Sequence, residues 1–282
     1  FVSANSQFQG GRYDGSSAIT LSAPASPSLP DSALLHSSSI IAIQEGLEPN
    51  YQMVCRDRNR LAMQADILGA YGLGINNILC LSGDHQSFGD CPTGQNVHDI
   101  DSMQLIQTVR HMRDEGKFLG GDDIKRPPQM FVGAAANPFA DPFEIRVPRL
   151  AKKIAAGVEF IQTQCIYDID KFELWMKMAG DRGLLEKVAI LAGVTPFKSV
   201  GMARYMKNRV PGIEVPDEMV KRMADTPKEK QPEEGIKICI ESIQRLQEIK
   251  GVRGFHVMAI EWEEMVPEIV EKSGLHPRPS VE

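Results

Sequence analysis

The sequence predicts an α/β fold, and within that class a TIM (β/α)8 barrel built as a single domain over residues 1–282. From residue 51 onward, short apolar runs alternate with longer segments of helical periodicity. The apolar runs are not interrupted by polar residues at every second position, which is typical of parallel strands covered on both faces by helices. The length of 282 residues suits eight strand–helix pairs, which need roughly 250 residues. An open, doubly wound sheet is the alternative, but no GxGxxG segment follows a predicted strand.

Six strands are expected after residue 50. They are YQMVC (51–55), NNILCLSG (76–83), QMFVGAAAN (129–137), EFIQTQ (159–164), KVAILAGV (187–194) and GFHVMAI (254–260). Two further runs, FVSA (1–4) and AITLS (18–22), would complete the eight strands of a barrel. The remainder of the first 45 residues is rich in Ser and Pro and carries little periodicity.

Each of these six strands is followed by one or more helical patterns. The patterns span residues 58–74, 101–116, 141–158, 168–183, 198–210, 216–226, 232–250 and 267–274. In the first pattern, Leu61, Ala65 and Leu68 keep the helical spacing of an apolar stripe. In the third pattern, Asp141 is the expected N-cap and Pro142 the expected first-turn proline.

Charge and composition favour a small-molecule ligand. The net charge is -6 and no block of Lys or Arg is present, which argues against nucleic acid as a partner. Five scattered cysteines form no CxxC pair, so neither a metal site nor a disulfide framework is expected, and a reducing cytoplasm is the expected location. No apolar stretch reaches the roughly 18 residues of a membrane span. The chain begins with Phe1 and not Met, so its natural start is expected upstream.

Polar residues follow the predicted strands, where a barrel of this type carries its reacting groups. Asp84, Asn137 and Gln164 end three of the strands, and Thr195, Pro196 and Glu261 hold the same place in two others. Each has a structural alternative: Asp84 as the cap of a turn, and Gln164 as a buried amide that holds its own loop.

Three long segments resemble the methylenetetrahydrofolate reductase family, and most closely its form in acetogenic and related anaerobic bacteria. They are GLEPNYQMVCRDRNRLAMQADILGAYGLGINNILCLSGDHQSFGD (46–90), AANPFADPFEIRVPRLAKKIAAGVEFIQTQCIYD (135–168) and ILAGVTPFKSVGMARYMKN (190–208). The likeness runs from about residue 46 to 275 and is poor over residues 1–45. It implies a TIM barrel that holds FAD and reduces 5,10-methylenetetrahydrofolate to 5-methyltetrahydrofolate by hydride transfer from the reduced flavin.

The resemblance also implies roles for individual residues. Asp84 matches the aspartate of the family's Gly-Asp motif, which binds folate and tunes the flavin, and Gln164 matches a glutamine that hydrogen-bonds the pterin. Lys153 matches a lysine near the FAD phosphates, whereas Gln52 and Ser82 replace a histidine and an arginine that contact FAD in enterobacterial members. The implied catalytic and substrate-binding residues are Asp84 and Gln164, and the implied cofactor-binding residues are Gln52, Ser82, Gly83, Asp84, Ala135, Asn137 and Lys153.

The first strand departs from the family. Family members end it with a glutamate that acts as general acid, whereas Asn5 lies near that position here, and an amide cannot supply the proton. Three explanations stay open: another acid, such as Asp14 or Glu261, replaces it; the first 45 residues are incomplete or incorrect; or the protein binds folate and flavin without turnover.

Two alternative functions stay open, and the missing acid suits the first. One is a folate-binding or scaffold subunit of a larger assembly, since acetogenic relatives are associated with an iron–sulfur partner subunit. Another is a folate methyltransferase barrel without flavin. The resemblance also implies an oligomer, and the sequence leaves the electron donor open among NADH, NADPH, ferredoxin and a partner's cluster.

Overall fold

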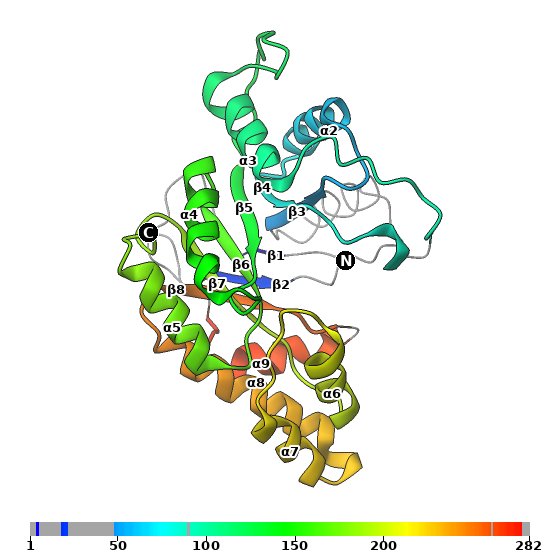
Figure 1. Cartoon of the computed structure of the whole chain (residues 1–282), viewed down its shortest axis with the longest axis vertical. Helices are drawn as coiled ribbons and strands as arrows, with labels where there is room; N and C mark the ends of the chain where they lie inside the picture. The colour runs from blue at the N-terminus through cyan, green and yellow to red at the C-terminus, as the bar shows by residue number, and fades with distance from the viewer. Residues whose placement is uncertain (1–3, 6–17, 22–47, 89–90, 261, 278–282) are drawn as a thin grey trace. The chain divides into compact units, whose positions relative to one another are not determined.

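A computed structural model describes residues 4–5, 18–21, 48–88, 91–260 and 262–277 (Figure 1). The chain divides into two compact units, each of which is described by itself. Unit 1 comprises Phe1–Tyr13, Ser22–Ala135 and Lys152–Ile161, and unit 2 comprises Asp14–Leu21, Ala136–Ala151 and Gln162–Glu282.

The strands of unit 1 are parallel apart from the first. Strands β3 (Glu48–Val54), β4 (Asn77–Leu81) and β5 (Phe131–Ala136) pair side by side in parallel. Strand β1 (Ala4–Asn5) pairs antiparallel with β3, so the expectation that every strand is parallel is wrong at this position.

The helices of unit 1 follow β3 and β4. Helix α2 (Arg60–Gly72) begins where the Asn59 side chain accepts from the amide of Ala62. Helix α3 (Ser102–Arg110) begins with a capping box formed by Asp101 and Gln104, and continues into a π-helical turn, η2 (His111–Glu115). A short turn, η1 (Gln86–Phe88), lies between β4 and α3.

The buried face of α2 differs from the predicted stripe. The side chain of Leu61 is 73% exposed, whereas Met63 and Ile67 are fully buried. The sequence pattern was ambiguous because apolar residues lie on both faces of this helix. Burial at Met63 and Ile67 keeps the i, i+4 spacing, shifted by two residues from the predicted stripe.

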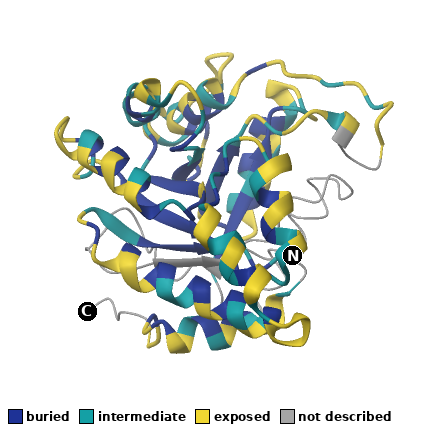
Figure 2. Ribbon diagram, turned by 60° about the horizontal axis from the view of Figure 1, so that its bottom comes forward, coloured by how far each residue is buried: buried dark blue, intermediate teal, exposed yellow. Residues whose placement is uncertain are grey.

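Unit 2 holds the other strands. They are β2 (Ala18–Leu21), β7 (Ala189–Val194), β8 (Val252–Val257) and most of β6 (Phe160–Cys165). Strand β8 pairs in parallel with both β2 and β7. Most strand residues from β3 to β8 are buried, and the helices carry both buried and exposed residues (Figure 2).

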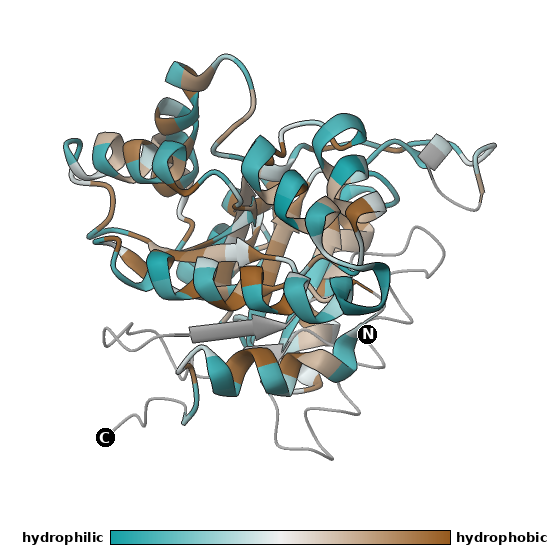
Figure 3. Cartoon of the chain, turned by 90° about the horizontal axis from the view of Figure 1, so that it is seen from below, coloured by the Kyte–Doolittle hydropathy of each residue, from teal (hydrophilic) through white to brown (hydrophobic). Residues whose placement is uncertain are grey.

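The helices of unit 2 alternate with these strands. The helices of the chain carry both hydrophilic and hydrophobic residues (Figure 3). Those of unit 2 are η3 (Phe143–Ile145), α4 (Arg146–Ala156), which ends in unit 1, α5 (Ile169–Gly180), α6 (Val200–Arg209), α7 (Asp217–Asp225), η4 (Lys228–Lys230), α8 (Gln231–Gln247), η5 (Glu263–Met265) and α9 (Val266–Lys272). The prediction that Asp141 caps a helix is wrong. Pro142 is followed by the 3-10 turn η3, and α4 begins only at Arg146.

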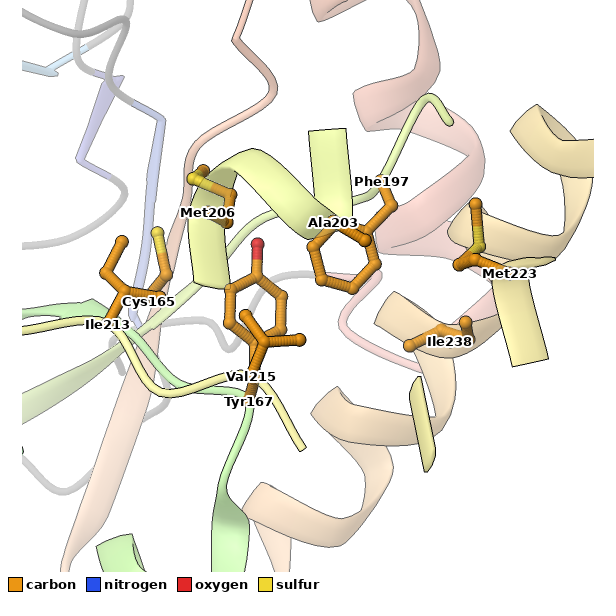
Figure 4. Packing of buried hydrophobic residues seen from close by; sticks show 9 residues of the cluster. All are labelled: Cys165, Tyr167, Phe197, Ala203, Met206, Ile213, Val215, Met223 and Ile238. Carbon is orange, nitrogen blue, oxygen red and sulfur yellow. The ribbon is translucent and has the colours of Figure 1, made fainter. Parts of the chain in front are cut away.

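An apolar cluster packs α6, α7 and α8 against the ends of β6 and β7 (Figure 4). The rings of Tyr167 and Phe197 stack in it with their centroids 4.5 Å apart. Ala203, Met223 and Ile238 contribute from the three helices. This cluster holds in place the segments that follow β6 and β7.

The predicted α/β class is confirmed, because parallel strands alternate with helices in the order expected. Closure of the strands into a barrel and the organisation as a single domain stay predictions. Among the described residues, no helix is long and apolar enough to cross a membrane.

Candidate functional site

The loop after β4 carries three of the predicted site residues. Ser82, Gly83 and Asp84 follow the last residue of the strand. Gly83 has a φ of 84°, and a Cβ at this position would lie 3.2 Å from the Cβ of Val54 and 3.1 Å from that of Arg56. A residue without a side chain is therefore needed here, both for the left-handed backbone conformation and for the close approach of Val54 and Arg56. At this glycine the chain turns out of the sheet.

Arg56 holds this loop at both of its ends. Its guanidinium Nη1 donates to the carbonyl oxygen of Asp84 at 3.0 Å. Its own carbonyl oxygen accepts from the amide of Val97 at 2.7 Å. Sequence reasoning missed Arg56, and no local pattern would have revealed it, because both partners are distant in the chain.

The carboxylate of Asp84 is exposed and makes no hydrogen bond or ion pair with any residue that the structure describes. Other aspartates of the chain behave differently. The side chain of Asp101 accepts from the amide of Gln104 at 2.8 Å, and that of Asp168 accepts from the amide of Lys171 at 2.9 Å. Asp84 therefore has none of the capping bonds that the structural alternative requires.

The other predicted residues of unit 1 lie in this loop, in β3 and β5, and in α4. The Ser82 hydroxyl donates to that of Ser102 at 3.0 Å and so connects the end of β4 to the start of α3. Gln52 is half-buried in β3 and lies opposite Leu79 of β4. The ammonium of Lys153 donates to the carbonyl oxygen of Ala135 near the end of β5. A cation is thus held at the carboxyl end of a strand.

In unit 2, Gln164 is an exposed residue in a strand that is otherwise buried. Its amide group has no partner among the described residues, whereas its carbonyl oxygen accepts from the hydroxyl of Thr163 at 2.9 Å. The same hydroxyl accepts from the amide of Gly193 in β7 at 2.8 Å. The Thr163 side chain thus connects β6 with β7 beside Gln164.

Asn137 has a structural role in unit 2. Its Oδ1 accepts from the amides of Phe139 and Ala140, at 3.1 Å each, and closes the turn after β5. Its Nδ2 lies against Gly212, where a Cβ would come within 2.0 Å of it. The prediction that Asn137 binds a cofactor stays untested.

His256 is a buried titratable group of β8 that sequence reasoning did not single out. Burial lowers its pKa to about 4, and a hydrogen bond to the backbone of Thr163 partly opposes this shift. It lies opposite Gly193, where a Cβ would come within 2.4 Å of the Thr163 carbonyl oxygen. The absence of a side chain at Gly193 therefore preserves this close approach of the strands.

The buried cysteines are not activated. Burial raises the pKa of the Cys55 thiol to about 12 and that of Cys165 to about 11, and it also raises that of Cys80. The fraction of reactive thiolate at neutral pH is therefore very small. No group of His, Cys, Asp or Glu that could hold a metal ion occurs among the described residues.

A surface groove of about 510 Å³ in unit 1 is lined by residues of α3, of η2 and of the end of α4. Its cations are already paired, since Arg60 contacts Asp99 at 2.8 Å and Arg110 contacts Asp114 at 2.9 Å. The groove therefore presents no unpaired arginine to an anion.

Parallel strands that alternate with helices define an α/β protein, and the exposed polar groups at the ends of these strands make up its candidate binding site. The family model of methylenetetrahydrofolate reductase matches residues 22–274. Because this match covers most of its length, the chain belongs to the methylenetetrahydrofolate reductase family.

Individual relatives are similar at a lower level. The chain is 25% identical to methylenetetrahydrofolate reductase 2 of Schizosaccharomyces pombe over 79% of this chain and 35% of that protein. It is 21% identical to a probable methylenetetrahydrofolate reductase (NADPH) of Caenorhabditis elegans, over 82% and 33%. The chain thus spans about a third of the length of these relatives. A particular likeness to the acetogenic form stays a prediction.

One solved structure with a partial likeness is an uncharacterized protein from Clostridium thermocellum, described as binding two copies of 5-methyl-5,6,7,8-tetrahydrofolic acid. Its TM-score is 0.43 at 14% identity, over 79% of this chain and 93% of that one.

Proposed function

We propose that this chain is an FAD-dependent reductase that converts 5,10-methylenetetrahydrofolate to 5-methyltetrahydrofolate. Membership of the family supports the reaction class. The observation that carries the proposal is the exposed carboxylate of Asp84, which no described residue neutralises or hydrogen-bonds. A carboxylate kept in this state is available to a cationic substrate.

The chemistry of the substrate explains why this site needs a carboxylate. The reactive form of the folate is a 5-iminium cation in equilibrium with a closed, neutral ring. A negative charge nearby favours the cation, and the attraction strengthens where water is displaced. Arg56 holds the backbone of Asp84 through the carbonyl oxygen and leaves the carboxylate unengaged.

Gln164 would orient the pterin. A primary amide has one acceptor and two donors, which match the mixed donor and acceptor edge of that ring. The side chain is exposed and has no hydrogen bond to lose among the described residues, so it can turn toward a ligand.

The residues at the ends of the strands fit FAD. The Lys153 ammonium at the end of β5 suits a phosphate, and Gly83 lets the backbone approach a ligand without a side chain between them. Gln52, Ser82 and Ala135 would complete the binding residues. When bound, FAD would supply the hydride for the reduction.

A second candidate function is a folate-binding subunit without turnover, which would work beside an iron–sulfur partner. It is favoured by Asn5, which lies in β1 near the position of the family's acid. Its amide cannot supply a proton. Asp14 and Glu261, the two substitutes suggested by the sequence, lie outside the described residues.

The visible spectrum of the purified protein tests the proposal. We expect flavin absorption that bleaches when 5-methyltetrahydrofolate is added without oxygen. The substitution Asp84→Asn should lower the bleaching rate by about 100-fold, in the range seen for removal of a charge-stabilising group. It should leave the melting temperature unchanged, because the carboxylate has no partner to lose.

Asp122→Asn, at another exposed aspartate of unit 1, is the matched control and should keep the bleaching rate of the original protein. A protein that stays colourless and takes up no FAD would exclude the reductase and leave the folate-binding subunit. Bleaching at the original rate in Asp84→Asn would remove Asp84 from the reaction.

A further inference from the structure

Three glutamines are buried in the described part of the chain, and only one of them lacks hydrogen-bond partners. Gln64, Gln162 and Gln231 are 5%, 2% and 7% exposed. Buried primary amides in folded proteins are nearly always hydrogen-bonded, because leaving a donor or acceptor unpaired costs free energy. Their partners therefore indicate what each glutamine does.

Gln64 and Gln231 stabilise the fold. Gln231 accepts from the amide of Val200 at 3.1 Å and donates to the carbonyl oxygen of Thr226 at 3.2 Å. Gln64 likewise donates to a carbonyl of its own helix at 2.9 Å and accepts from the amide of Leu119 at 2.8 Å. In both residues the amide nitrogen and the amide oxygen are satisfied by the protein.

Gln162 is the most buried of the three, yet neither its Nε2 nor its Oε1 has a partner among the described residues. Two backbone groups that bond to the next residue, Thr163, are already engaged. Its hydroxyl donates to the carbonyl oxygen of Gln164 and accepts from the amide of Gly193. The protein therefore keeps at Gln162 an amide that the described part of the fold does not use.

The position of Gln162 connects it with the proposed site. It lies two residues before Gln164 in β6, and side chains two apart project from the same face of a strand. Two unpartnered amides thus follow one another along one face, separated by about 7 Å of strand, and the second is exposed at its carboxyl end. Turning either side chain toward a ligand breaks no hydrogen bond.

We infer that Gln162 is a second ligand-binding amide of this site, below Gln164. The group that it recognises is an adjacent carbonyl and N–H on a fused pyrimidine ring, which one primary amide can pair with through its donor and its acceptor. The pterin of a folate and the isoalloxazine of a flavin both carry this edge. The inference rests on the proposed function and assigns it a further residue.

The test replaces each of two buried glutamines of unit 2 with methionine, which has a similar length and no amide. Gln162→Met should raise the dissociation constant for 5-methyltetrahydrofolate or for FAD at least tenfold, which corresponds to about 1.4 kcal/mol. It should not lower the melting temperature of the ligand-free chain. Gln231→Met, the matched control, should lower the melting temperature and change both affinities less than twofold.

The two ligands distinguish the two sources of the ring. A loss confined to the folate assigns Gln162 to the pterin, and a loss confined to FAD assigns it to the isoalloxazine. Unchanged affinity for both ligands overturns the inference. If the melting temperature also falls, the amide is used by a bound water and not by a ligand. If Gln162→Met does not fold, Gln162→Leu takes its place. If the original protein binds neither ligand, the proposed function itself fails.

Discussion

At the scale of single residues, the hydroxyl of Thr163 connects β6 with β7. It accepts from the amide of Gly193 and donates to the carbonyl of Gln164, and the residue is 2% exposed. A buried amide and a partly buried carbonyl therefore bond to one side-chain oxygen. The end of β6 is thus connected to β7 through a side chain.

Thr163→Val keeps the shape of the side chain and removes the hydroxyl. We expect the free energy of unfolding to fall by about 1–3 kcal/mol, because the buried amide of Gly193 and the partly buried carbonyl of Gln164 both lose this partner. Urea unfolding measures the change. Thr108→Val is the control: Thr108 is 3% exposed, but its hydroxyl donates only within α3, to Gln104. An equal loss in both variants would contradict the bridging role.

At the scale of secondary-structure elements, two helices contain an interior glycine, and the space around the two glycines differs. Gly235 of α8 lies so close to the loop after β7 that a Cβ would come within 1.7 Å of the Phe197 carbonyl oxygen. Gly69 of α2 is exposed, and a Cβ there would meet nothing within 4 Å. Only the first glycine is required by packing.

Alanine substitutions should therefore have opposite signs. Gly235→Ala should lower the free energy of unfolding by about 1–3 kcal/mol or more, because the helix must move away from a rigid backbone. Gly69→Ala should raise it by about 0.5–1 kcal/mol, the usual gain of alanine over glycine in a helix interior. Thermal unfolding of the pair checks both signs, and a loss at Gly69 would contradict this account of the helix.

The elements that could be predicted from the sequence are those with a long apolar or periodic pattern. The six strands after residue 50 and the helices between them follow their predicted order. The start of α4 was not predictable. Residues 143–145 form a 3-10 turn before Arg146, and their composition would equally suit the first turn of an α-helix. The antiparallel direction of β1 depends on pairing with β3, which a two-residue strand does not encode.

The candidate site was predictable where it follows from position. Asp84 is the third residue after β4 and Gln164 the last residue but one of β6, and both are exposed. The role of Arg56 was not predictable, because its partner is a backbone carbonyl 28 residues away. The role of Gln162 was not predictable either. Whether a buried amide has hydrogen-bond partners depends on all the residues around it in three dimensions.

At the scale of the whole molecule, stability should depend on pH through His256. Its pKa is about 4 in the folded protein against an ordinary value of 6.5, so the unfolded chain binds the proton first. Stability from this group is complete above pH 6.5, falls as the pH drops from 6.5 to 4, and is constant below that range. Between pH 7 and pH 5 the loss should be about 2 kcal/mol.

Urea unfolding at both pH values measures this loss, and His256→Gln should remove it by eliminating the titrating ring. His276→Gln, at an exposed histidine of the same unit, should keep the pH dependence of the original protein. An identical dependence in His256→Gln and the original protein would contradict the assignment.

Arg56 holds both ends of the segment that follows β4, through the carbonyl of Asp84 and the amide of Val97. These two bonds to Arg56 fix the distance between the ends of this loop, and the residues between the ends take no part in them. Changing the length of a closed loop costs little, since even a doubling adds only about 0.6 kcal/mol. The length of this loop can therefore change at little cost in stability, while the backbone of Asp84 stays bonded to Arg56.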